Sequence, residues 1–404
     1  MTARRHVLSA RASFWVAAAV VAHTLWTSAA PAMTYPLYAA QWALTPTMTT
    51  AVFGIYPIVV VAMLILFGDI SDHIGRRFTI LLGLAASIVG VLCFAMAPSV
   101  AWLFIGRCFM GIGVGLSAGP SSAAMLEFSA PGQSKRASSV NTASQAAGLT
   151  FALLTSGLLI EYAPLPTRLN FWLLTAVLLA IFSAAFFLPS RTGSETPRGW
   201  KPRVPYVAPP LRRAFAIAVA AVSAAYALGG MLLAVGAHIS SELIRSSNVF
   251  VNAAILSTFA ISVGVVGILA KQLPARLSMG IGGMAAFLAM ALLSEAARRH
   301  SIGLFFGSSV ASGFGYSLLY LGGMNLISVH APLHHRGGTL SSLYLIAYLM
   351  QGLVSMLVGR AATSWGMGRA LNFGAAGISG LCVVVVLLAI FLSTSTTARS
   401  FGAR

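Results

Sequence analysis

Arg107 is the residue whose type and position most strongly indicate chemistry, because it is the only Lys or Arg deep inside a long apolar segment. A guanidinium in such a segment costs at least ~2.5–3.5 kcal/mol on membrane-insertion scales unless it faces protein or a water-filled cavity. It is therefore a candidate to bind an anionic group, since its planar fork can pair with a carboxylate at two points. The alternative is a structural role, in which the guanidinium donates to backbone carbonyl groups of a neighbouring segment.

A second group of charged residues lies in the polar segment from Gly68 to Arg77, GDISDHIGRR. Asp72 stands among bases at the edge of an apolar run, where a carboxylate is costly to desolvate without a partner. One interpretation is a local ion pair with Arg76 or Arg77. The other is a latch, in which Asp72 docks on a later helix that begins at Gly337 and whose first N–H groups form a positive end. The predicted gate motif comprises Gly68, Asp69, Asp72, Gly75, Arg76, Arg77, Gly338 and Ser341.

Uncharged polar residues near the centres of apolar runs are candidates to line a substrate cavity. For each of them singly, a hydrogen bond between two helices is the alternative role. The candidates are His23, Asn141, Gln145, Asn325 and Gln351.

Catalytic and cofactor chemistry finds little support in the sequence. The three cysteines, Cys93, Cys108 and Cys382, lie singly inside apolar runs, with neither CxxC spacing nor a nearby His cluster. No phosphate-binding GxxxxGK[ST] motif is present. An intramembrane Asp pair or Ser/His pair is also missing, and His334-His335 has no acidic neighbour. We therefore predict no enzyme activity, no cofactor and no metal.

The elements that position these residues follow from composition. The chain is 58% hydrophobic and 8% charged, whereas soluble domains average about 25% charged residues. Its formal net charge is +18, but the bases lie between apolar runs rather than on a soluble domain, which argues against nucleic-acid binding.

Runs of about 20 apolar residues predict transmembrane helices in a lipid bilayer. Twelve runs fit, at 13–33, 47–67, 78–97, 101–126, 137–160, 168–188, 213–236, 250–270, 278–295, 301–328, 338–360 and 369–392.

The distribution of bases predicts orientation. Eighteen of the 25 Lys and Arg residues fall in one set of connecting segments, six in the other, and Arg107 is the remaining one. Because basic loops stay on the cytoplasmic side, both termini are predicted to be cytoplasmic. The N-terminus resembles a secretory signal, and we interpret it as an uncleaved first helix.

The chain divides into two related halves. We predict an N-terminal six-helix half at 1–189, a basic, Pro-rich cytoplasmic linker at 190–211 and a C-terminal six-helix half at 212–404. An internal repeat supports the division. At an offset of 200, Gly113 and Gly115 fall on Gly313 and Gly315, which makes Gly307 the counterpart of Arg107.

The segment from Gly68 to Arg77 resembles the signature loop of the major facilitator superfamily, GxxxDRxGRR in outline, with His73 in place of the usual Arg. The fourth run, with Gly106-Arg107 followed by glycines, is similar to the family's membrane-embedded Arg motif. The stretch Gly148–Gly157 lacks the proline usual in the family's drug/proton antiporters. The resemblance covers nearly the whole chain. It implies the two-domain fold of a general bacterial permease in the inner membrane, with a latch at the cytoplasmic gate.

The resemblance implies secondary transport by alternating access. A pocket with Arg107 and amides but no buried carboxylate suits anionic or neutral organic molecules, so we expect export of a small organic molecule or metabolite, with proton coupling left open. The alternative is proton-coupled uptake of an organic acid. The alternative functions from other classes of protein are a membrane enzyme and a non-transporting sensor. The expected partners are a small-molecule substrate, protons and lipid, with the chain acting as a monomer.

Overall fold

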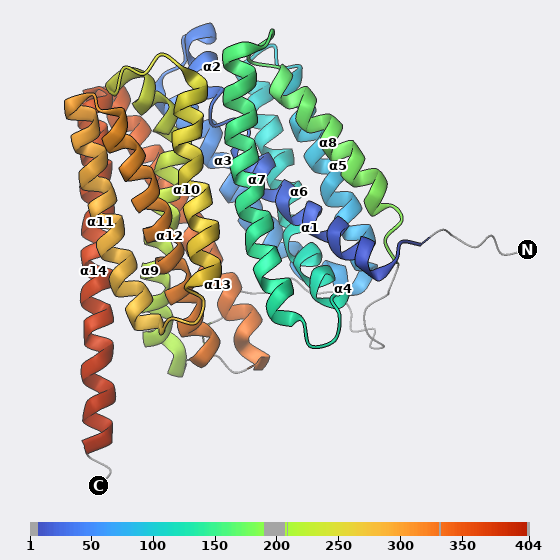
Figure 1. Cartoon of the computed structure of the whole chain (residues 1–404), viewed down its shortest axis with the longest axis vertical. Coiled ribbons are helices and arrows are strands. Elements are labelled where there is room, and N and C mark those ends of the chain that lie inside the picture. The colour runs from blue at the N-terminus through green and yellow to red at the C-terminus, as the bar shows by residue number, and fades with distance from the viewer. Residues whose placement is uncertain (1–6, 190–206, 208, 331–332, 402–404) are drawn as a thin grey trace, which may run out of the picture. The chain divides into compact units, whose positions relative to one another are not determined.

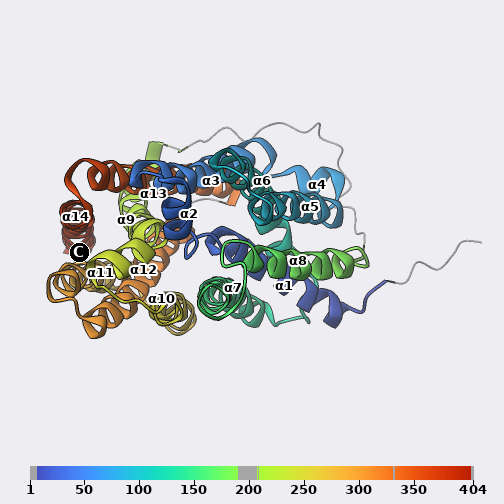
Figure 2. The ribbon, with the colours of Figure 1, turned by 90° about the horizontal axis from the view of Figure 1, so that it is seen from above.

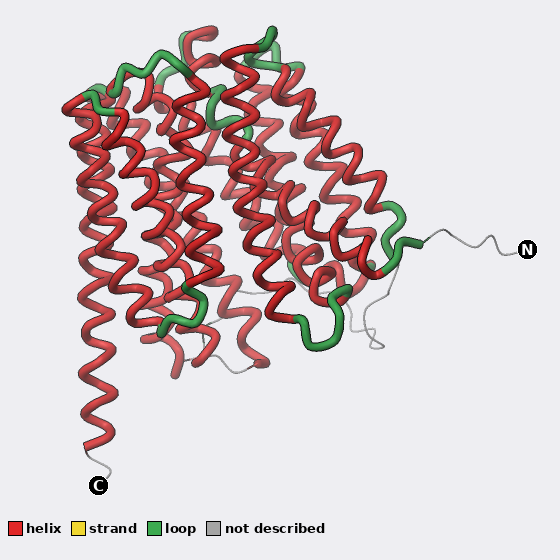
Figure 3. The backbone as a smooth tube through the Cα atoms, in the orientation of Figure 1, coloured by secondary structure: helices red, strands yellow, loops and turns green. Residues whose placement is uncertain are grey.

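The chain folds into helices throughout the part that the structure describes. The structure is a computed structural model that describes residues 7–189, 207, 209–330 and 333–401. Most of the predicted linker at 190–211 therefore lies outside the described residues. Helices account for all the regular secondary structure of these residues, and no strand occurs among them (Figure 3). In lipid the helix satisfies its own backbone hydrogen bonds, which is why apolar runs of this length adopt it.

Eleven helices within the described residues are long and apolar enough to cross a membrane, and α8, with 17 residues, is a shorter apolar helix. Together they coincide with the twelve predicted runs and confirm an all-α, multi-pass membrane fold. The first half contains α1 (Ala10–Ala29), α2 (Tyr35–Trp42), α3 (Pro46–Phe67), α4 (Ile70–Ile74), α5 (Arg76–Ala95), α6 (Val100–Glu127), α7 (Ser134–Tyr162) and α8 (Leu169–Ala185). The second contains η1 (Pro209–Leu211), α9 (Arg212–His238), η2 (Ile239–Leu243), α10 (Val249–Leu269), α11 (Ala275–Arg299), α12 (Ile302–His330), α13 (Leu333–Trp365) and α14 (Met367–Phe401).

Two compact units make up the chain. Unit 1 comprises residues 1–38 and 55–204, and unit 2 comprises residues 39–54 and 205–404. The start of α3 belongs to unit 2 because it packs on α13: the backbone N–H of Thr47 donates to Thr363 Oγ1 at 3.0 Å. Gly359 leaves the space that the Thr50 side chain occupies. A division of the sequence at the linker does not predict that residues 39–54 belong to unit 2.

The same packing scheme occurs inside each unit (Figures 1 and 2). In unit 1, α1 packs against α6 and α7, and α5 packs against α6 and α8. In unit 2, α9 packs against α12 and α13, and α11 packs against α12 and α14. The first span of each unit thus contacts the fourth and fifth, and the third contacts the fourth and sixth. This correspondence supports the internal repeat.

The packing corrects the register of that repeat in the fourth span. Gly113 faces α5, where an added Cβ would lie 2.6 Å from Gly83 O. Its counterpart by packing is Gly315, which faces α11, where a Cβ would lie 2.7 Å from the backbone nitrogen of Ala286. The structural offset in this helix is therefore 202 rather than 200.

This register changes the counterpart of Arg107. Gly111 faces α3 near Val59, and the residue 202 positions later, Gly313, faces α10 near Phe259. The same offset places Ser309, not Gly307, at the position that corresponds to Arg107. Ser309 is fully buried in α12.

Candidate functional site

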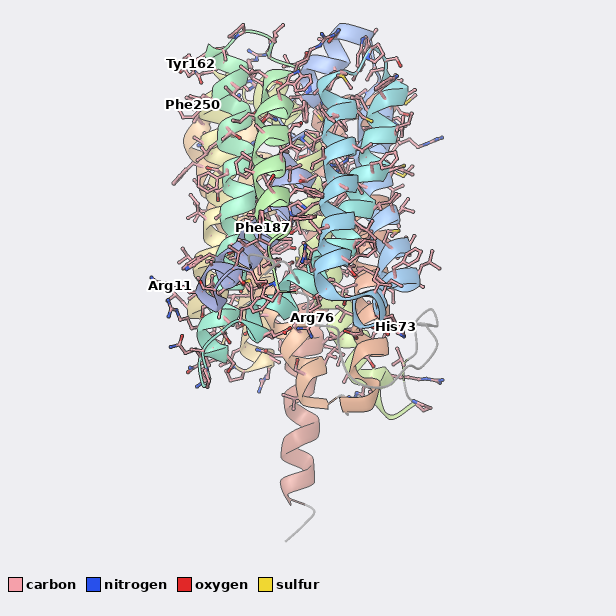
Figure 4. The ribbon with its side chains drawn as sticks, turned by 90° about the vertical axis from the view of Figure 1, so that its right-hand side faces the viewer. Arg11, His73, Arg76, Tyr162, Phe187 and Phe250 are labelled. Atoms are coloured by element: carbon pink, nitrogen blue, oxygen red, sulfur yellow. The ribbon has the colours of Figure 1, made fainter. Side chains whose placement is uncertain are left out.

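The predicted gate motif begins in the turn between α3 and α5. Asp69 precedes the short helix α4, and the Asp72 N–H donates to the Asp69 carbonyl at 3.0 Å. Gly75 follows with φ of +88°, a conformation that favours glycine. The Asp72 side chain is exposed. In Figure 4, His73 and Arg76 lie at one end of unit 1, together with Arg11, and Tyr162 lies at the other.

Both arginines of the motif contact other partners than Asp72. Arg76 forms an ion pair with Glu127 at the end of α6. The Arg77 guanidinium lies 4.9 Å from the centroid of the Phe186 ring, after α8. Within the described parts of the chain, the local ion pair of Asp72 with Arg76 or Arg77 is not formed. The arginines instead join the ends of three helices of unit 1.

The motif residues in α13 do not lie at the start of a helix, contrary to the sequence-based prediction. Helix α13 begins at Leu333, so Gly337 and Gly338 lie inside the helix rather than at its start. Ser341 lies two turns into α13 and is half-buried.

Arg107 lies in α6 and is fully buried. Its Nη1 donates to the Ser28 carbonyl in α1 at 2.8 Å, and its guanidinium carbon lies 4.5 Å from the centroid of the Tyr56 ring in α3. A cation–π contact of this kind contributes about 0.5–2 kcal/mol, most when it is desolvated. The hydrogen bond to a backbone carbonyl of another span corresponds to the structural alternative. This bond joins α6 to α1, and the contact with Tyr56 joins α6 to α3.

The five predicted cavity residues fall into different surroundings. His23 is buried, with Nδ1 bonded to the Val20 carbonyl and Nε2 at 3.3 Å from Ser87 Oγ in α5. Asn141 Oδ1 in α7 accepts from Ser122 Oγ in α6 at 2.9 Å. Both are contacts between helices of unit 1.

The three other candidates are half-buried: Gln145 in unit 1, and Asn325 and Gln351 in unit 2. Asn325 Nδ2 lies 3.5 Å from the Leu273 carbonyl, at the limit of a hydrogen bond. Gln351 packs its aliphatic part on Gly230 of α9. Its Oε1 is buried and has no hydrogen-bond partner within the described residues. Among the five predicted cavity residues, Gln351 alone has a buried side-chain polar atom without a hydrogen-bond partner within the described residues.

A group of aromatic residues in unit 2 was missed by sequence reasoning. Tyr226, Tyr316, Tyr320, Tyr344 and Tyr348 lie in the middle of α9, α12 and α13, and their rings contact one another. The sequence contains one signal for them, since Tyr316/Tyr320 and Tyr344/Tyr348 are spaced four apart and share a helix face. We call these five residues the tyrosine cluster.

The comparisons with known proteins decide the family. The model of the Major Facilitator Superfamily matches residues 15–294, which is more than half of the chain. The chain belongs to the major facilitator superfamily. It is therefore a multi-pass membrane protein of a family of transporters, and the resemblance found in its signature loop is confirmed. No curated protein sequence matches the chain significantly.

Two solved structures show the same fold as this major facilitator protein. A mutant of the nucleoside transporter NupG aligns with a TM-score of 0.75 at 12% identity, over 93% of this chain and 98% of that one. A bacterial homologue of the human lysosomal transporter Spinster, in an inward-facing and unoccupied conformation, aligns with a TM-score of 0.67 at 15% identity, over 95% of each chain. At these identities the likeness concerns the fold alone.

Proposed function

We propose that this protein is a secondary transporter that works by alternating access and exports a small organic molecule. The observation that supports it best is the repeated packing scheme of its two units, because alternating access uses two related helical bundles that move against each other. The absence of a nucleotide-binding motif from the sequence favours transport driven by gradients rather than by ATP.

The charge distribution favours a neutral or anionic substrate. No Asp, Glu, Lys or Arg other than Arg107 lies deep in an apolar run, and a cation held there would have no counter-ion. Arg107 is already engaged by Ser28 and Tyr56 in this structure. We therefore favour a neutral substrate over an anionic one. Proton-coupled uptake of an organic acid is the second candidate, and it depends on Arg107 turning to the substrate.

The proposed gate is a latch on the predicted cytoplasmic side. Asp72 is exposed, and both neighbouring arginines contact other groups. Its carboxylate is therefore available to an anion-binding group such as the first N–H groups of a helix. The base asymmetry of the sequence supports an orientation with both termini in the cytoplasm, in the inner membrane. We take the functional unit to be a monomer.

Counterflow in proteoliposomes tests the proposal. Vesicles that contain the purified protein are loaded with one compound at high concentration, and uptake of a trace amount of the same labelled compound is followed for a panel of neutral and anionic aromatic and aliphatic metabolites. We expect accumulation of at least one neutral or anionic compound without ATP. Ligand binding without counterflow of any bound compound would indicate a sensor and contradict the transport proposal.

A further inference from the structure

The tyrosine cluster occupies an unusual place for its residue type. Five of the chain's ten tyrosines lie near the centres of α9, α12 and α13. Tyrosine in membrane proteins concentrates at the two membrane–water interfaces, where the ring meets lipid and the hydroxyl meets water. Hydroxyl groups at mid-span need partners, because lipid offers none. Anchoring at the membrane–water interface therefore does not explain why these tyrosines lie at mid-span.

The rings form one continuous aromatic surface. Tyr226 meets Tyr348 edge to face, with centroids 4.9 Å apart and planes at 88°. Tyr226 and Tyr316 are nearly parallel at 6.1 Å, and Tyr316 and Tyr320 are nearly parallel at 6.4 Å. Phe259 of α10 extends the surface, with its ring 5.6 Å from that of Tyr316. These distances lie within the range of favourable aromatic pairs.

The cluster is not a sealed core. Tyr226 is buried, but Tyr316, Tyr320, Tyr344 and Tyr348 are half-buried. Tyrosines of a packed interior are buried, as Tyr35, Tyr38 and Tyr56 of unit 1 are. Half-buried rings that carry hydroxyl groups instead offer both a stacking surface and hydrogen-bonding atoms to a bound molecule.

The hydroxyl groups of Tyr320 and Tyr344 leave hydrogen-bonding capacity unused. The oxygens of Tyr320 and Tyr344 lie 2.8 Å apart and bond each other across α12 and α13. One hydrogen serves this bond, so the hydrogen of the accepting hydroxyl remains available to a ligand acceptor. Tyrosine hydroxyls are therefore able to orient a molecule that stacks on the rings.

Gln351 supplies an acceptor beside the rings. It follows Tyr348 by three residues in α13 and packs on Gly230, which follows Tyr226 by four residues in α9. Residues so spaced are neighbours on one helix face, so the amide lies one turn from the contact between Tyr226 and Tyr348. An unsatisfied buried acceptor such as Gln351 Oε1 costs about 1–3 kcal/mol. A ligand N–H or O–H group would remove that cost.

The surroundings of the cluster carry no charge. The sequence contains no Asp, Glu, Lys or Arg in residues 215–237, 250–270, 302–329 or 339–359, the central parts of α9, α10, α12 and α13. Aromatic rings do attract cations, but a cation at mid-span without an acidic partner would carry its full desolvation cost. A neutral molecule meets no such cost.

We propose that the tyrosine cluster, with Gln351, is the part of the substrate site that binds a neutral planar aromatic or heteroaromatic ring bearing a hydrogen-bond donor. The cluster stacks on the ring, and Gln351 Oε1 accepts from the donor. This inference rests on the proposed transport function and specifies its substrate class.

Binding to the purified protein in detergent tests the inference independently of transport. The probes are naphthalene-2-carboxamide, its saturated analogue decahydronaphthalene-2-carboxamide, naphthalene-2-carboxylate and tetraethylammonium, measured by isothermal titration calorimetry. We expect naphthalene-2-carboxamide to bind at least tenfold more tightly than its saturated analogue, because only the planar ring stacks on the tyrosines. We also expect it to bind more tightly than the carboxylate and the cation.

Four variants separate the ring, its hydroxyl and the Gln351 amide from general damage to the fold. Tyr316→Leu should weaken binding of naphthalene-2-carboxamide about tenfold, whereas Tyr316→Phe should stay within about threefold of wild type, because stacking needs only the ring. Phe373→Leu is the control, since it removes an exposed ring of unit 2 that packs on Trp365 outside the cluster. It should bind as wild type does. Gln351→Leu should weaken binding of naphthalene-2-carboxamide more than binding of naphthalene-2-carboxylate, which has no hydrogen-bond donor.

The outcomes distinguish this inference from the transport proposal. Equal binding of the planar and saturated carboxamides, equal effects of Tyr316→Leu and Phe373→Leu, or preference for tetraethylammonium would overturn the inference and leave transport untouched. Ring-dependent binding without counterflow of any compound would support the site and contradict transport.

Discussion

Arg76 at the start of α5 forms an ion pair with Glu127 at the end of α6, 51 residues later. The two side chains are 35% and 22% exposed, so solvent screens the pair only in part. The contact fixes the end of the signature loop to the fourth span. Arg76 is therefore paired with Glu127 and not with the Asp72 carboxylate.

Removal of the Arg76–Glu127 pair should weaken unit 1 modestly. We expect Glu127→Gln to lower the stability by about 1 kcal/mol, the upper end for exposed pairs, because the pair is partly buried. Thermal unfolding of Glu127→Gln, Arg76→Gln and the double variant measures the coupling. Strictly additive losses in the double variant would show that the two side chains do not stabilise each other.

Asp72→Asn should impair transport while the protein still reaches the membrane. The substitution removes the charge of the proposed latch and keeps its shape, so we expect at least a tenfold lower transport rate with normal thermal stability. Counterflow of any compound that the wild type transports provides the measurement. Asp72→Glu keeps the charge and should retain more activity than Asp72→Asn. Wild-type rates in Asp72→Asn would contradict the latch.

Arg107 substitutions separate its structural role from an anion-binding role. Arg107→Gln should lower the stability by about 2 kcal/mol through loss of the cation–π contact with Tyr56, and Arg107→Lys by less, since Lys keeps the charge but not the planar fork. Affinity for naphthalene-2-carboxamide should be unchanged in both. Selective loss of affinity for naphthalene-2-carboxylate would instead identify Arg107 as a ligand of anionic substrates.

Gly113→Ala should destabilise unit 1 by about 1–3 kcal/mol, as overpacking does. A Cβ at this position would overlap Ser87 Oγ and lie 2.6 Å from the Gly83 carbonyl, so α5 and α6 would have to separate. Gly119→Ala in the same helix is the matched control, because nothing lies within 4 Å of its added Cβ. Equal melting temperatures for the two variants would show that the close approach of α5 and α6 is not required.

Cysteine labelling tests the orientation. In a variant without Cys93, Cys108 and Cys382, a cysteine at Pro202 should react with an impermeant maleimide only from the cytoplasmic side, and one at the exposed Ser247 only from the outside. The expectation follows from the excess of bases in the loops of the first set. The opposite pattern would reverse the topology.

The sequence by itself determined the class of fold and the position of the signature loop. The number and length of the spans depend only on the hydropathy of consecutive residues, and the loop from Gly68 to Arg77 is a local motif. Both can therefore be read without knowledge of distant contacts.

The tertiary structure decided which side chains meet. The spans are apolar around most of their circumference, so periodicity does not tell which face of a helix packs against which neighbour. The partner of Arg76, the contacts of Arg107 and the meeting of Tyr226 with Tyr348 all depend on that rotation.

The register of the repeat shows the same limit. Gly313 and Gly315 can be matched to two pairs of glycines in the fourth span. An offset of 200 pairs them with Gly113 and Gly115, and an offset of 202 pairs them with Gly111 and Gly113. The folded structure decides for the offset of 202, because Gly113 and Gly315 both face the third span of their own unit. Close packing requires small residues where backbones approach, and where they approach is a property of the folded bundle.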